Sequence, residues 1–113
     1  MIRSIRKFVA ELSAPPDRAP SADQVALAIA ALLVETARAD FDLHEEELAE
    51  LGRLLAERLG IDTAEASSLA ARARDAVERS VSLYEFTRPL QETLSYREKE
   101  EVVRMLWHVA VAD

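Results

Sequence analysis

The residues of this sequence with the clearest capacity for chemistry are the acids between positions 40 and 50. This stretch, DFDLHEEELAE, holds six carboxylates and no basic residue. Asp42 is a good helix N-cap, and acids in the first turn of a helix are stabilised by its dipole by ~0.3–1 kcal/mol each. Asp40 does not fit this explanation, because it would end the preceding helix, where the dipole disfavours negative charge. Carboxylates gathered at one turn repel each other, and a bound cation would relieve that repulsion.

We therefore predict that a divalent cation with a preference for hard oxygen ligands, such as Ca²⁺, Mg²⁺ or Mn²⁺, binds at this turn. The loop is not an EF-hand, because Glu45 stands where the glycine would be and Leu51 where the last glutamate would be. Two alternatives remain. The acids form an ordinary solvated face, or they dock a basic protein partner, for which we select Glu46, Glu47 and Glu50.

The sequence lacks the motifs of other common catalytic and cofactor sites. The chain has no cysteine, no glycine-rich phosphate loop and no serine in a Gly-x-Ser-x-Gly context. His108 has no chemical partner nearby in the sequence, and we expect an ordinary surface histidine. The net charge of −7 argues against nucleic-acid binding, which needs a basic surface. We expect a protein that is not an enzyme.

The elements that must position the acids are predicted to be helices. Only two glycines and four prolines interrupt a chain rich in Ala, Leu, Glu and Arg, and apolar residues recur at intervals of three and four. Gly60 has the residue type that favours a helix C-terminus. Four pairs have the spacing of a capping box at a helix start: Ser21 with Gln24, Asp42 with Glu45, Asp62 with Glu65, and Ser95 with Glu98. The fold class is therefore all-α, a single compact domain of about six helices.

The apolar pattern of each helix predicts how the helices pack. Residues 25–34 are apolar on every side and should form a central helix. The pattern of residues 84–94 predicts a short helix. We expect Tyr84, Phe86 and Tyr96 around it to form a core cluster or to wedge between helices. The alternative is that they line a groove for a peptide. The helix that begins near Asp42 has a predicted core stripe of Leu48, Leu51, Leu55 and Leu59. The last helix has a predicted core stripe of Val103, Leu106, Ala110 and Trp107. We expect Trp107 to anchor the C-terminal half of the domain.

Residues 1–20 differ from the rest in charge and composition, and we separate them as an amphipathic helix and proline-rich linker before a domain at 21–113. The predicted helix has basic residues off its apolar stripe of Ile2, Ile5, Phe8, Val9 and Leu12. We expect this stripe to pack on the domain; the alternatives are a homodimer interface and an anionic membrane surface. The longest apolar run, Val25 to Val34, is too short to span a bilayer, and no signal-peptide pattern is present. We expect a cytoplasmic protein, with contact to the inner face of the membrane as the alternative.

A weak internal repeat links the two halves of the chain. A shift of 73 residues aligns ALLVETARAD, ending at Asp40, with RMLWHVAVAD, ending at Asp113. In both copies an aspartate follows an apolar helix and an alanine-rich turn. We therefore expect weakly pseudo-repeated halves.

At these residues the chain resembles a known family. The phrase ALLVETARADFDLHEEE resembles the first signature of the TerB-like (tellurite resistance protein B) domain, an A-D-G-x-I-x-x-x-E turn between two helices. The stretch LYEFTRPLQETLSYREKEEVVRMLWHVAVAD resembles the second half of the family, which runs into another A-D-G turn. Together the two stretches place the resemblance over residues ~24–113.

The resemblance implies a set of acidic residues and a class of function. It places Asp40 and Glu46 as the characteristic acids, Asp42 between them, and Asp113 at the start of the second turn; Phe41 replaces the usual glycine. With the acidic cluster, this selects Asp40, Asp42, Glu46 and Asp113 as metal ligands, with Glu45, Glu35 and His44 as second choices. The family resemblance implies a binding or scaffold module with a protein partner, linked to tellurite resistance and stress response, and cation binding by its acids.

Overall fold

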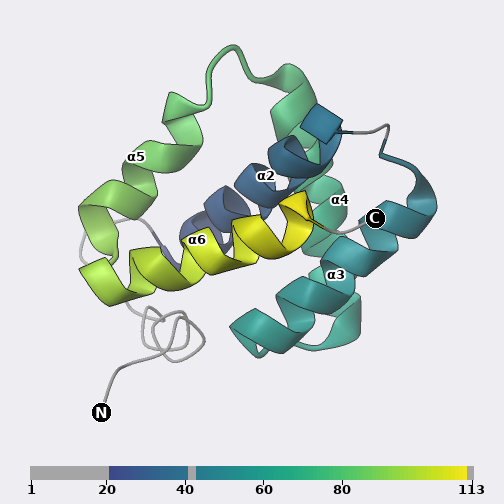
Figure 1. Cartoon of the computed structure of the whole chain (residues 1–113), viewed down its shortest axis with the longest axis horizontal. Helices are drawn as coiled ribbons and strands as arrows, with labels where there is room; N and C mark the ends of the chain where they lie inside the picture. The colour runs from purple at the N-terminus through teal and green to yellow at the C-terminus, as the bar shows by residue number, and fades with distance from the viewer. Residues whose placement is uncertain (1–20, 41–42, 112–113) are drawn as a thin grey trace.

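The computed structural model describes residues 21–40 and 43–111 of the chain, except for the side chain of Asp40 (Figure 1). These ranges contain five α-helices and no strand, so the prediction of an all-α fold is confirmed. The first predicted helix and the linker after it lie outside the described residues. The helices are α2 (Ala22–Asp40), α3 (Glu45–Leu59), α4 (Thr63–Arg79), α5 (Tyr84–Thr93) and α6 (Tyr96–Ala110).

Three of the four predicted capping pairs form at the helix starts. Ser21 and Gln24 exchange bonds, the Ser21 N–H donating to Gln24 Oε1 at 2.7 Å and the Gln24 N–H to Ser21 Oγ at 3.1 Å. The N–H groups at the third helical positions of α4 and α6 donate in the same way to Asp62 and Ser95. These bonds satisfy backbone donors that have no partner within the helix.

The predicted start of α3 is wrong. Its N-cap is His44, not Asp42, because the His44 carbonyl accepts the first helical bond from the Leu48 N–H at 2.9 Å. Glu47 Oε1 accepts from the His44 N–H at 2.8 Å, so a glutamate three residues after the N-cap still completes the start. At the other end of α3, Gly60 adopts the predicted left-handed conformation with φ 70°, which glycine reaches without a Cβ penalty.

The central position predicted for the all-apolar helix is confirmed. Helix α2 packs against each of the four other described helices, and Figure 1 shows α6 crossing in front of it with α4 behind. Its Ile29 and Leu33 are completely buried. The predicted leucine stripe of α3 is buried as well, with Leu54 in addition. None of the helices in the described part of the chain is long and apolar enough to cross a membrane.

The predicted core face of α6 is wrong. The buried apolar residues are Val102, Met105 and Val109, and Glu98 is buried with them, whereas Trp107 is 65% exposed and Val103 49% exposed. Ala110 is also exposed, and Leu106 is half-buried. The helix carries two apolar stripes on adjoining faces, and both satisfy helical spacing, so the pattern alone does not distinguish them. Trp107 therefore does not anchor the core.

The predicted aromatic cluster around α5 forms only in part. Phe86 is buried against the core, but Tyr84 is 62% exposed and Tyr96 is 82% exposed. Each tyrosine is the first residue of its helix, where side chains reach solvent more easily than at the middle of a packed helix. Phe86 alone fills the predicted wedge position.

Candidate functional site

The acidic turn lies between the end of α2 at Asp40 and the start of α3 at Glu45. Glu46 is exposed in the first turn of α3. The Asp40 side chain and the whole of Asp42 and Asp113 lie outside the described residues. Among the residues that the structure describes, no three His, Cys, Asp or Glu side chains are grouped closely enough to hold a metal ion. The cation site therefore stays a prediction that depends mainly on the other three acids.

The second-choice ligands have other contacts or other locations. Glu45 pairs with Arg74 of α4 at 3.5 Å, which joins the first turn of α3 to α4. His44 is exposed as the N-cap of α3. Glu35 lines a cavity of about 200 Å³ with Val77 and Phe86, so it faces the junction of α2, α4 and α5. None of these three is placed with Glu46 in a described cluster.

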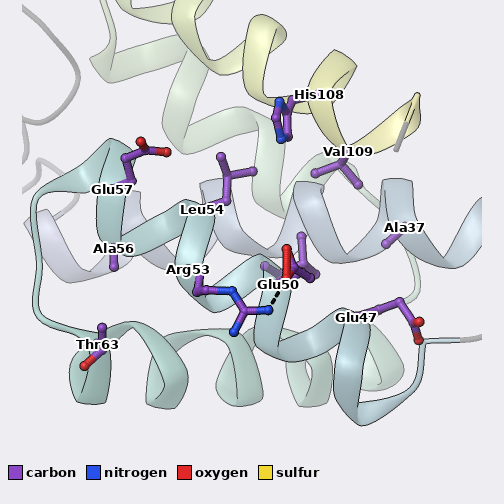
Figure 2. Close-up of a pocket in the computed structure, with 11 residues that line it drawn as sticks. Ala37, Glu47, Glu50, Arg53, Leu54, Ala56, Glu57, Thr63, His108 and Val109 are labelled. Carbon is purple, nitrogen blue, oxygen red and sulfur yellow. Dashed lines mark hydrogen bonds and ion pairs between the residues drawn. The ribbon is translucent and has the colours of Figure 1, made fainter. Parts of the chain in front are cut away.

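A groove of about 730 Å³ lies between α3 and α6, over the C-terminal part of α2 (Figure 2). Its apolar lining comes from Leu51 and Leu54 of α3, Val109 of α6 and Ala37 of α2. The groove exists because α6 packs on α2 while α3 packs mainly on α4, so α3 and α6 make few contacts with each other. We call this feature the α3–α6 groove.

The rim of the α3–α6 groove is acidic along α3. Glu47, Glu50 and Glu57 line it together with Arg53, whose guanidinium pairs with Glu50. The rim thus holds three carboxylates and one guanidinium, and Glu47 Oε1 also accepts from the His44 N–H at 2.8 Å. Figure 2 shows His108 on α6, across the groove from Leu54 and Arg53 on α3. The groove thus combines an apolar lining with a negative edge, which suits a ligand that is apolar on one face and basic on the flank.

Sequence reasoning found this site only in part. Glu47 and Glu50 were selected for partner binding and line the groove, whereas Glu46 is not among its lining residues. His108 and Glu57 were missed as lining residues. The signal present in the sequence was the spacing of Glu47, Glu50, Leu54 and Glu57, which places them along one edge of a helix.

Comparison with known proteins identifies the family of this domain. The model of the family described as Tellurite resistance protein TerB matches residues 26–113. This range includes all of α3 to α6 and most of α2. Searches of curated proteins and of solved structures returned no match. The resemblance read from the acidic turn and from the C-terminal helices is therefore confirmed, and the chain belongs to the TerB family.

Proposed function

We propose that this protein is a non-enzymatic binding module of the TerB family that docks a protein partner in the cytoplasm through the α3–α6 groove, in a pathway of tellurite resistance or stress response. The observation that carries the proposal is the apolar groove with three carboxylates along one edge. The chain's membership of the TerB family supports a role in tellurite resistance or stress response.

The chemistry of the groove favours a basic, amphipathic segment as the partner's contact. An amphipathic helix places apolar side chains in such a groove at intervals of three and four residues, and burial of these side chains provides most of the affinity. Basic residues on the flank of that helix would face Glu47, Glu50 and Glu57. Charge complementarity of this kind raises the association rate and selects against acidic partners.

The acidic turn supports cation binding as a second proposed property. Asp40 is the last residue of α2 and Glu46 lies in the first turn of α3, so carboxylates from two helices would supply hard oxygen donors at this turn. Asp40, Asp42, Glu46 and Asp113 would hold Ca²⁺, Mg²⁺ or another divalent cation. Binding there would offset the repulsion between the acids and stabilise the junction of α2 and α3.

A capture experiment at two salt concentrations tests the groove. The tagged protein is used to capture partners from lysate at low and high NaCl, beside a Glu50→Lys/Glu57→Lys variant and an Asp75→Lys/Glu78→Lys control on the exposed part of α4. We expect specific capture by the wild type and by the control at low salt, reduced several-fold by the groove variant and by high salt. Equal capture by all three proteins would rule out the groove as the docking site.

The cation proposal needs a separate measurement. We expect Ca²⁺, Mg²⁺ or Mn²⁺ at millimolar concentration to raise the Tm of the wild type, and we expect Asp40→Asn/Asp42→Asn to abolish this rise. A chelator would then lower the Tm of the wild type only. An unchanged Tm with every metal would reject cation binding. A rise that survives in the double variant would place the site elsewhere.

A further inference from the structure

We propose that, in the chain without a partner, the α3–α6 groove is occupied by the chain's own residues 2–12. This inference rests on the proposed function, because it takes the same groove as the docking site. It adds an internal occupant that a partner must displace. The charge pattern, the length of the segment and the reach of the linker each support it.

The segment matches the groove in chemistry. Residues 1–20 carry four basic and two acidic residues, and Arg3, Arg6 and Lys7 lie beside the apolar stripe of the predicted helix. The groove has Leu51, Leu54 and Val109 in its lining, each less than a tenth exposed, and three carboxylates along its edge for basic flanks. In the sequence no other segment combines an apolar stripe with three bases so close together.

The segment also matches the groove in length. Glu47 and Glu57 mark the two ends of the acidic edge and are ten residues apart on α3, which corresponds to ~15 Å of helix. A helix from Ile2 to Leu12 also has ten residue steps and the same ~15 Å. A segment of this length contacts the acidic edge along its whole extent.

The linker is long enough for docking within one molecule. Ser21, where the linker meets the domain, lies sixteen residues before the groove residue Ala37, or ~24 Å along α2. The eight residues from Ser13 to Pro20 span up to ~26–29 Å when extended. Their three prolines favour extended backbone over a collapsed coil. The segment therefore reaches the groove of its own chain, where tethering gives a high effective concentration.

The exposed stripe on the outer face of α6 is the competing apolar surface. It consists of Tyr96, Val103, Trp107 and Val111. The same helix carries Arg97, Lys99 and Arg104, against Glu100 and Glu101 near the stripe's midpoint. Helix α6 carries three acids and three bases, and Arg104 pairs with Glu100 at 3.9 Å, so this surface has no excess of acids, whereas the groove has an acidic edge. Charge therefore directs the segment to the α3–α6 groove.

A spin label tests the docked position in the full chain. The chain has no cysteine, so Ser4→Cys provides a single attachment site for a nitroxide, whose proximity broadens amide NMR signals. We expect the signals of residues 50–57 and 105–109 to lose more than half of their intensity, while those of 84–93 are retained. Adding Phe8→Asp to the labelled chain should restore the intensity, and so should Glu50→Lys/Glu57→Lys, but not Asp75→Lys/Glu78→Lys.

Three results would overturn the inference: broadening centred on the outer stripe of α6, no localised broadening, or broadening that arises only between labelled and unlabelled molecules.

Partner capture separates this failure from failure of the proposed function. If the segment does not dock but Glu50→Lys/Glu57→Lys still abolishes capture, the groove remains the partner site. If the segment docks but Glu50→Lys/Glu57→Lys captures as much partner as the wild type, the proposed function fails instead. When both hold, full-chain Phe8→Asp should capture several-fold more partner than the wild type.

Discussion

At the scale of single residues, Met105 and Trp107 illustrate how two neighbouring apolar side chains on α6 differ in environment. Met105 is completely buried, whereas Trp107 is mostly exposed. We expect Met105→Ala to lower the free energy of unfolding by ~2–5 kcal/mol, because it leaves a cavity in the core. Trp107→Ala should lower it by less than ~1 kcal/mol. Urea unfolding followed by circular dichroism measures both, and a larger loss in Trp107→Ala would contradict the described packing.

A surface ion pair gives a pH-dependent prediction at the same scale. Arg72 donates two hydrogen bonds to Asp23, at 3.0 and 3.2 Å, and these lower the pKa of Asp23 from its ordinary value of 3.8. The pair therefore contributes its full stability above the unfolded pKa and loses it as the pH falls through the lower, folded pKa. Because both side chains are largely exposed, the contribution should be below ~1 kcal/mol.

Comparing Asp23→Asn with the wild type by thermal unfolding from pH 7 to pH 2 checks this prediction. The variant should be slightly less stable at pH 7, and the difference should disappear at the acidic end. Sodium chloride at 0.5 M should reduce the difference at pH 7, since an exposed pair is screened. A difference that grows in acid would contradict the assignment to Asp23.

At the scale of the elements, the two glycines of the chain should respond to alanine in opposite directions. Gly60 ends α3 with φ 70°, so Gly60→Ala should destabilise the protein by ~1 kcal/mol. Gly52 lies inside α3, and a Cβ there would meet the Ser67 Cα at 3.7 Å, an ordinary contact distance. Gly52→Ala should therefore stabilise by ~0.5–1 kcal/mol. Unfolding of the two variants beside the wild type tests both, and the same sign for both would refute the backbone argument.

The elements themselves were largely predictable from the sequence because their ends depend on local chemistry. Ser21, Asp62, Ser95 and Gly60 act through backbone atoms within four residues, so a short window contains the whole signal. The rotation of α6 about its axis depends instead on contacts with α2. Two apolar stripes were compatible with the spacing, and no local signal chose between them.

At the scale of the whole molecule, the N-terminal segment should contribute to the stability of the domain. The helix predicted for this segment has about twelve residues and would be marginal alone in water, so we expect it to need contacts with the domain. We expect deletion of residues 1–14 to lower the Tm markedly in dilute, lipid-free solution. An unchanged Tm, with loss only of dimerisation or of binding to anionic vesicles, would instead assign the segment to one of those roles.

The groove could not be predicted from the sequence because it belongs to no single element. Ala37, Leu54 and Val109 meet only after α2, α3 and α6 have packed, and they are separated by up to 72 positions in the chain. The acidic edge of the groove could be predicted in part from the sequence, because Glu47 and Glu50 lie on one helix. Of the four predicted metal ligands, only Glu46 has a described side chain, so that part of the prediction remains untested.

The exposure of Trp107 has a consequence for spectroscopy. It is the single tryptophan of the chain, and its indole already contacts water in the folded state. Its emission should therefore change little when the core unfolds, and iodide should quench it in both states. The same indole would shift to the blue and lose its quenching when another molecule covers the outer face of α6. The intrinsic fluorescence of this protein thus reports on its contacts with other molecules and not on its folding.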